Sequence, residues 1–137
     1  MFDPKNHLRP TIPSIKKKIS SSLEEQFQNK ALRPIIKLQH KLIISCFEQY
    51  LTKNKINLHV LSDEQRKAVI EKAFARDTRL KTDMRSLIIG LFTLEEYNEY
   101  LSNQSQINKR INSIIQERIG SVFILPKSSL EDKKNIL

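Results

Sequence analysis

The chain has 137 residues, of which 39% are hydrophobic and 28% charged, a balance that is typical of one globular domain and excludes a disordered chain. It holds only two glycines and no Asn-Gly, Asp-Gly or Gly-Gly step for a tight hairpin, so the composition predicts an all-α protein. The formal net charge of +9 would suit an anionic partner such as nucleic acid, an acidic protein or lipid headgroups.

The start of the chain is predicted to be an extended, basic arm. Pro4, Pro10 and Pro13 each remove a backbone donor and bias the preceding residue away from helix. Pro126 is expected to end the ordered body near the other end of the sequence. The expected divisions are an arm over residues 1–20, one helical domain over 21–125 and a flexible tail over 126–137.

Capping boxes and apolar spacing predict five or six helices in the domain. Ser22, Ser62 and Thr93 each precede a Glu or Gln by three residues, the pattern in which a hydroxyl and a side-chain oxygen satisfy free N–H groups at a helix start. The expected helices span 23–32, 34–53, 63–76, 78–92, a segment from Thr93 through Leu101, and 105–122. Together they predict an irregular or orthogonal bundle.

The segment from Pro34 to Lys53 is predicted to be the central helix. Its apolar residues cover more than one stripe, with Leu42 near the middle, so we expect neighbours to enclose it on two or three sides. Pro34 either opens this helix or bends a longer one. A helix with so much apolar surface is also expected to leave a patch for a second copy of the chain.

The segment Ser121-Val122-Phe123-Ile124-Leu125 leaves one alternative open. It follows Gly120 and is rich enough in β-branched and aromatic residues to form a strand. A strand without a mate in its own chain would have to pair across a dimer. The alternative is the end of the last helix.

No catalytic, cofactor or metal site is predicted. His7, His40 and His59 are far apart in sequence and lack the companion ligands of a zinc site. Two glycines cannot make a P-loop or a dinucleotide fingerprint, which need several at fixed spacing. Cys46 lies in an apolar run and is expected to be a small buried hydrophobe.

Basic residues are concentrated in the first 60 positions, with 11 Lys or Arg against 4 Asp or Glu. Arg79 and Asp83 are four apart on a predicted helix and should form an ion pair. A helix-turn-helix over 80–103 is disfavoured because the helix after Thr93 is acidic, the wrong sign for a phosphate backbone. The candidate contacts with an anion or a partner are Lys16, Lys17, Lys18, Lys30, Arg33, Lys37, Lys41, Arg79, Lys81, Arg85, Lys109 and Arg110.

Several short segments carry a resemblance to a known family. They are Arg9-Pro10-Thr11-Ile12-Pro13, Phe27-Gln28-Asn29, Leu32-Arg33-Pro34-Ile35-Ile36-Lys37-Leu38-Gln39, Ile88-Ile89-Gly90-Leu91-Phe92-Thr93, Glu95-Glu96-Tyr97 and Asn108-Lys109-Arg110. Through them the chain resembles a small bacterial all-helical family over most of residues 8–123. Members of that family sometimes carry the label glyoxalase, which would imply βαβββ units and a metal held by His and Glu. The sequence predicts neither, so the resemblance adds no mechanism.

The sequence therefore favours a non-enzymatic protein of the cytoplasm that interacts with other proteins, as an adaptor or regulator, and forms a homodimer. One alternative is a protein that binds nucleic acid without sequence specificity through its basic N-terminal half. The other is a small enzyme, including the activity that the glyoxalase label names. No insertion into a membrane is expected, because the longest apolar run falls far short of a bilayer span.

Overall fold

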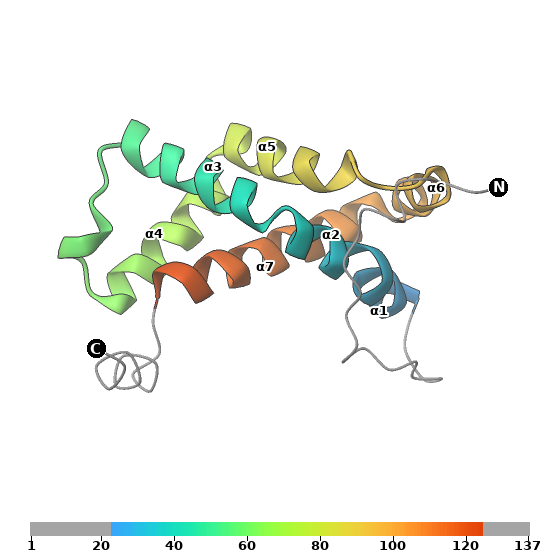
Figure 1. The fold of residues 1–137 in the computed structure, drawn as a ribbon, viewed down its shortest axis with the longest axis horizontal. Helices are drawn as coiled ribbons and strands as arrows, with labels where there is room; N and C mark the ends of the chain where they lie inside the picture. Colours follow the sequence, from blue (N-terminus) through green and yellow to red (C-terminus); the bar gives the residue numbers. More distant parts are fainter. Residues whose placement is uncertain (1–22, 125–137) are drawn as a thin grey trace.

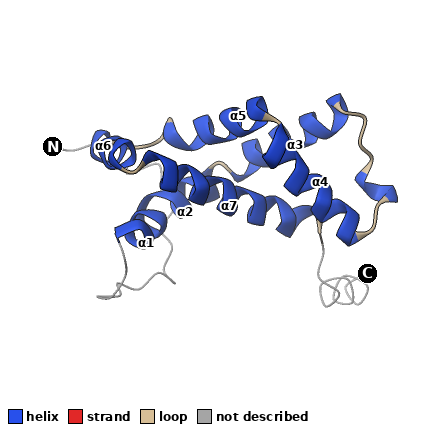
Figure 2. Ribbon diagram, turned by 180° about the vertical axis from the view of Figure 1, so that it is seen from behind, coloured by secondary structure: helices blue, strands red, loops and turns tan. Residues whose placement is uncertain are grey.

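The computed structural model describes residues 23–124, and every regular element among them is helical (Figures 1 and 2). The elements are α1 (Leu23–Phe27), the π turn η2 (Gln28–Leu32), α2 (Arg33–Leu38), α3 (His40–Lys53), the 3₁₀ turn η3 (Leu58–Val60), α4 (Asp63–Arg76), α5 (Thr78–Ile89), α6 (Leu94–Ser102) and α7 (Gln104–Phe123). The all-α prediction is confirmed. The expected arm over 1–20 and the expected tail over 126–137 lie outside the described residues.

The helices form two layers (Figure 1). In the upper layer of that view α3 and α5 run side by side in opposite directions, and in the lower layer α4 packs against α7. The connected segment from α1 to α2 lies across the first half of α7. At the end of the molecule, just beyond α5, lies α6.

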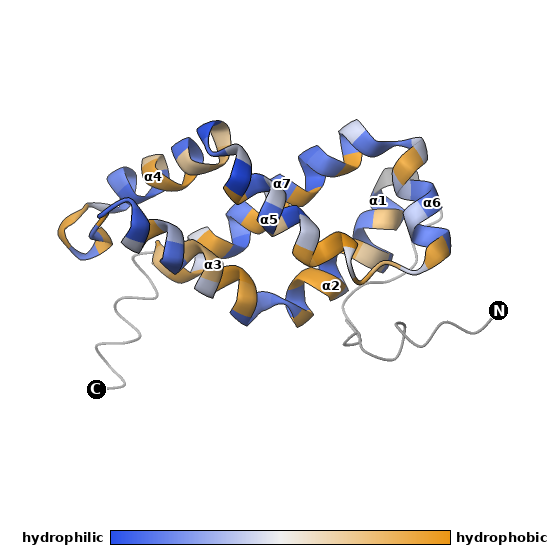
Figure 3. Ribbon diagram, turned by 90° about the horizontal axis from the view of Figure 1, so that it is seen from above, coloured by the Kyte–Doolittle hydropathy of each residue, from blue (hydrophilic) through white to orange (hydrophobic). Residues whose placement is uncertain are grey.

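The core is built from large aliphatic side chains and one aromatic cluster. Figure 3 shows hydrophobic and hydrophilic residues side by side on α3, the pattern of a helix with one buried face. Phe47 is fully buried, and its ring centroid lies 5.7 Å from that of Tyr50 and 5.5 Å from that of Phe123. The largest fully buried side chains are Phe47, Leu32, Ile35, Ile36, Ile43, Met84, Ile88, Ile111, Ile115 and Ile119. These residues come from five elements, η2, α2, α3, α5 and α7, which therefore share one core.

The two complete capping boxes that the sequence predicts within the described residues are both formed. The backbone N–H of Ser62 donates to Gln65 Oε1 at 2.9 Å, and the N–H of Gln65 donates back to Ser62 Oγ at 3.2 Å. Thr93 and Glu96 make the same reciprocal pair at 2.9 and 3.2 Å. The boxes place the starts of α4 and α6 one residue after the capping hydroxyl, which is why these two helix starts agree with the predicted ones.

The predicted central helix over 34–53 is wrong in one respect, because the chain breaks its helical path at Gln39. The backbone of Gln39 has φ −89° and ψ 10°, and its side-chain Nε2 donates to the carbonyl of Leu87 on α5 at 3.0 Å. Gln39, which departs from helical geometry, thus has a hydrogen-bond partner in α5. Two shorter helices, α2 and α3, replace the single long one.

Leu42 is also not enclosed as predicted. Its side chain is 54% exposed and that of Leu38 is 41% exposed, whereas Ile43 and Phe47 are completely buried. The reason is that α5 and α7 cover one side of α3, and no described helix covers the side of Leu38 and Leu42. The helix does leave apolar side chains exposed, as predicted. They include Leu42, which was expected to be at the enclosed centre.

Pro34 lies in the first turn of α2, as one of the two predicted alternatives has it, but no break precedes it. Phe27, Leu32 and Arg33 all have right-handed helical φ and ψ, so α1, η2 and α2 form one continuous path. The N–H of Arg33 donates to the carbonyl of Gln28, five residues back. A proline ring collides with the carbonyl four residues earlier in a regular α-helix, and the wider π turn relieves that collision.

The strand alternative at 121–125 is wrong for the residues that the structure describes. Ser121, Val122 and Phe123 form the last turn of α7, and the N–H of Ile124 still donates to the carbonyl of Gly120 at 2.8 Å. Ile124 itself is extended. The α7 segment therefore follows its regular apolar spacing to its end, and local β propensity does not override it.

Candidate interaction surfaces

One side of α6 exposes three large apolar side chains, which we call the α6 face: Leu94, Tyr97 and Leu101. They are 72%, 41% and 48% exposed. Spacings of three and four residues place them on one side of the helix. The adjoining side of α6 buries Tyr100, whose hydroxyl donates to Asn108 Oδ1 at 2.7 Å. A nine-residue helix is thus apolar on two sides, of which the residues that the structure describes cover one.

The capping box fixes which side of α6 faces outward. Thr93 and Glu96 are both buried, with 7% and 6% of their surfaces exposed. Their reciprocal hydrogen bonds set the start of the helix at Leu94, whose side chain is left exposed. Glu95 and Glu99 are also exposed, but they lie on another flank of α6. The α6 face is consequently an exposed apolar surface.

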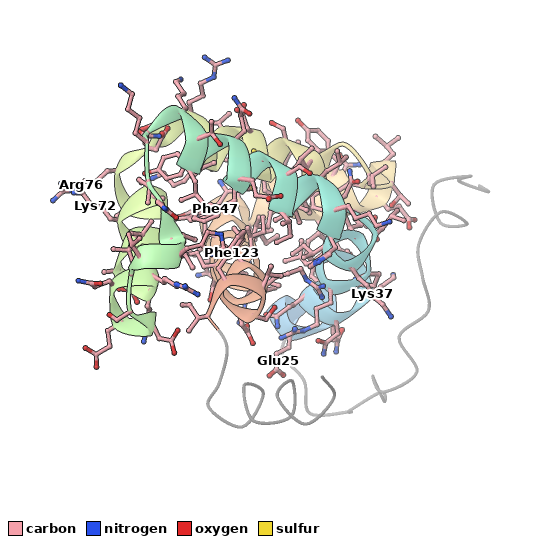
Figure 4. The ribbon with its side chains drawn as sticks, turned by 60° about the vertical axis from the view of Figure 1, so that its left-hand side comes forward. Glu25, Lys37, Phe47, Lys72, Arg76 and Phe123 are labelled. Atoms are coloured by element: carbon pink, nitrogen blue, oxygen red, sulfur yellow. The ribbon has the colours of Figure 1, made fainter. Side chains whose placement is uncertain are left out.

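A second surface lies on α2, α3 and the turn before them, and we call its four cations the basic stripe: Lys30, Arg33, Lys37 and Lys41. Successive members are three or four residues apart, so the helical path brings them to one side. Lys30, Lys37 and Lys41 are exposed and Arg33 is half-buried. None of the four forms an ion pair within residues 23–124. Figure 4 shows Lys37 extending from α2 into solvent.

The structure places the other predicted cations elsewhere. Arg79 pairs with Asp83 at 3.9 Å, as predicted, but the two side chains are 83% and 56% exposed, and such pairs contribute little to stability. Lys81 and Arg85 lie two residues on either side of Asp83, and therefore on the opposite side of α5. Lys16, Lys17 and Lys18 lie outside the described residues. Among the predicted cations that the structure describes, the four of the basic stripe are the ones that lie together on one side.

The predicted basic pair Lys109 and Arg110 is divided between solvent and the body. Lys109 is exposed, whereas the half-buried Arg110 donates from Nη1 to Gln28 Oε1 at 2.6 Å. This bond joins α7 to the π turn. Arg110 thus has a structural role, although its guanidinium has further N–H donors beside this one.

The histidines are likewise used within the chain or stand alone. His40 Nδ1 lies 3.2 Å from Arg118 Nη1, and since a guanidinium only donates, the imidazole nitrogen accepts. His59 is exposed in the turn η3, and its backbone N–H donates to Asn57 Oδ1. His7 lies outside the described residues. Across residues 23–124 no three His, Cys, Asp or Glu side chains come together as a metal ion would need.

The hollow beside η3 has a volume of about 440 Å³, and one of the polar residues that line it, Arg66, has a structural role. Its Nε donates to the carbonyl of Leu58 at 2.8 Å and its Nη1 to the carbonyl of Phe123 at 3.0 Å. A smaller hollow of about 290 Å³ lies between α6 and the segment formed by α1 and η2. Phe27 and Glu99 are among the residues that line it. The larger hollow is also lined by Glu48, Thr52 and His59, and the smaller one by Lys30 and Ser102.

Burial, together with nearby acids, changes the pKa of two side chains on α3. Burial, and secondarily the negative charge of Asp83, raises the pKa of the Cys46 thiol above its usual value of 9.0. Burial, and secondarily Asp77, raises the pKa of Tyr50. Both effects favour the neutral form, and a thiol held neutral is a poor nucleophile.

Cys46 is accordingly expected to react with a disulfide reagent at pH 8 more slowly in the folded protein than in the chain unfolded by urea. The measurement is the rate of thiol release in each state. The raised folded-state pKa has no effect on the free energy of unfolding below pH 9.0, and lowers it as the pH rises through the folded value. Equal rates in the two states would show that the thiol is not protected.

Comparison of the chain with protein-family models, with curated proteins and with solved structures finds no match in any of the three. The resemblance to a bacterial helical family therefore stays a prediction. Within residues 23–124 no helix combines the length and the apolar character that crossing a bilayer requires. The α6 face and the basic stripe are the features of the described residues that best fit a partner.

Proposed function

We propose that this protein is a non-enzymatic interaction protein that associates with a second copy of itself. The observation that carries the proposal is the α6 face, where Leu94, Tyr97 and Leu101 stay exposed on a helix that is otherwise well anchored. Large apolar patches at regular spacing mark interaction sites more often than isolated surface residues do. A single thiol with no disulfide partner suits the cytoplasm, where we place its action.

The energetics suggest that the α6 face acts together with a second surface. Burying a Leu or Tyr-sized apolar side chain contributes roughly 1.5–3 kcal/mol, and these three are already partly covered. Association costs about 4–15 kcal/mol in lost translational and rotational freedom. Three side chains alone would therefore bind weakly. Leu38 and Leu42 on α2 and α3 offer the additional apolar area.

The test is the oligomeric state of variants, measured by light scattering after gel filtration. The native protein should be a dimer, and the double variant Leu94→Ser, Leu101→Ser should be a monomer with an unchanged melting temperature. Val60→Ser is the control, because Val60 is 75% exposed but belongs to neither surface. It should leave the dimer intact. A native protein that stays monomeric at every concentration would overturn the proposal.

The basic stripe favours a second candidate, the binding of nucleic acid without sequence specificity. Four cations over twelve residues, with no acid between Lys30 and Lys41, would suit successive phosphates. Four such contacts predict a slope of about −3 when log affinity is plotted against log salt concentration. Retention on single-stranded DNA that does not weaken with salt would count against this candidate.

A further inference from the structure

The helix α7 adds a cation to the edge of the basic stripe. His40 follows Lys37 by three residues, so it lies beside the stripe on the helical path. Arg118 Nη1 lies 3.2 Å from His40 Nδ1, which brings the half-buried guanidinium of α7 to the same edge. Within residues 23–124 no acid forms an ion pair with Arg118. Sequence spacing does not group Arg118 with the stripe, because 78 residues separate it from His40.

Three cations of the stripe and Arg118 form what we call the basic surface: Arg33, Lys37, Lys41 and Arg118. Lys30 is left out because it lines a hollow together with Glu99 of the same chain. None of the four forms an ion pair within residues 23–124. The segment that carries the first three has no acid between Glu25 and Glu48. The basic surface therefore has charges that the described part of the chain does not neutralise.

The basic surface lacks the side chains that hold unpaired bases. Proteins that bind single strands stack the bases on exposed aromatic rings. No Phe, Tyr or Trp lies between Phe27 and Phe47 in the sequence, and both of these rings are buried. A nucleic acid on this surface would therefore be held through its phosphates and sugars and not through its bases.

Binding through phosphates alone favours a duplex over a single strand. The segment from Arg33 to Lys41 extends for about 12 Å at about 1.5 Å per residue. A duplex carries one charge per roughly 1.7 Å of its axis, and one of its strands carries one per roughly 3.4 Å. About seven phosphates of a duplex fall within that length, against about half as many of a single strand.

We propose that the basic surface binds the backbone of a double-stranded nucleic acid without reading its sequence. The proposal rests on the nucleic-acid candidate described above and names the form of the nucleic acid. It does not depend on self-association through the α6 face. A protein partner fits less well, because protein interfaces are enriched in aromatic residues and depleted in Lys, whereas Lys and Arg are the usual contacts to phosphate.

Fluorescence anisotropy with labelled DNA tests the preference for a duplex. A duplex and a single strand of equal length are each titrated at several salt concentrations. The native protein should bind the duplex several-fold more tightly, with a slope of about −3.6 when log affinity is plotted against log salt concentration, because four contacts release counterions. Equal affinity for the two forms would overturn the duplex preference while the nucleic-acid candidate stands. No salt-dependent binding of either form would overturn both.

Neutral substitutions test whether the basic surface is the site. Replacing Lys37 and Lys41 together by glutamine should make the slope shallower by about 2, and Arg118→Gln should do so by about 1. Glutamine keeps an N–H group that can donate to His40, so Arg118→Gln should retain the native melting temperature. A native slope in both variants would overturn the assignment to this surface.

The control variant carries Lys72→Gln and Arg76→Gln on α4. These two cations are exposed, are four residues apart like Lys37 and Lys41, and lie on the opposite side of the molecule in Figure 4. The control removes the same charge as the double variant of the stripe and should keep the native slope. An equal loss in the control would show that net charge, and not the basic surface, determines binding.

Two competitors distinguish a nucleic acid from other anions. Poly-glutamate represents an acidic protein, and vesicles that contain phosphatidylserine represent a lipid surface. Neither should displace the labelled duplex at an equal concentration of charge. Displacement by either competitor would overturn the assignment to a nucleic acid.

Discussion

Replacing Phe47 by alanine is expected to lower the free energy of unfolding by about 3–5 kcal/mol, the range for a large aromatic residue removed from a core. Phe47 is completely buried, and its ring contacts those of Tyr50 on α3 and Phe123 at the end of α7. The cavity would therefore open where α3 and α7 meet. Urea unfolding followed by circular dichroism measures the change.

Leu42→Ala is the matched control for Phe47→Ala. It removes apolar atoms from the same helix, but from a side chain that is 54% exposed, so it should lower the free energy of unfolding by less than about 1 kcal/mol. Losses of similar size at the two positions would show that α3 is rotated relative to its described orientation, with Leu42 inside.

Replacing Arg66 by methionine is expected to lower the free energy of unfolding by about 1.5–3 kcal/mol, since hydrogen bonds from a charged donor are stronger than neutral ones. Its guanidinium donates to the carbonyls of Leu58 and Phe123, at 2.8 and 3.0 Å. The Phe123 carbonyl belongs to the last turn of α7, where no intrahelical partner is available and a cation is favourable. Methionine keeps the packing of the side-chain stem and removes only the donors.

Lys67→Met tests whether that loss is specific to Arg66. Lys67 is the next residue on α4, is exposed and carries the same charge. The change there should alter the free energy of unfolding by no more than about 0.5 kcal/mol. If the two methionine variants unfold at the same urea concentration, the two carbonyl contacts do not stabilise the fold.

Local signals predicted most of the helices. The helix over 63–76 agrees with α4 at both ends, because Ser62 and Gln65 form a capping box and Asp77 ends one helix while capping the next. Scarce glycine and regular apolar spacing sufficed for the fold class. These features depend on neighbours within four residues in the sequence, which is the range that such patterns describe.

The features that depend on distant contacts were not predicted. The break at Gln39 is accompanied by a bond to Leu87, 48 residues away, and no pattern near Gln39 announces it. Likewise, the exposure of Leu42 depends on where α5 and α7 lie, not on the composition of α3. Apolar content showed how much surface α3 has to cover, but not which side the neighbours would leave open.

The candidate surfaces were predicted unevenly. The spacing of Lys30, Arg33, Lys37 and Lys41 was sufficient to group them, because a helix converts that spacing into proximity. The α6 face was missed, although its signal was present in a short segment with apolar residues on two sides. Arg110 was grouped with Lys109 by sequence, and only its bond to Gln28 shows that it serves the fold.

The π turn has a consequence for how the two ends of the fold meet. The turn carries one more residue than an α-helical turn, and the ring of Phe27, just before it, lies 5.5 Å from that of Phe92 between centroids. Removing one residue between Gln28 and Leu32 would restore an ordinary α-helix and turn everything before it by about 100°. Phe27 would then point away from Phe92. The one additional residue in the π turn thus keeps Phe27 oriented toward Phe92, which lies just before α6.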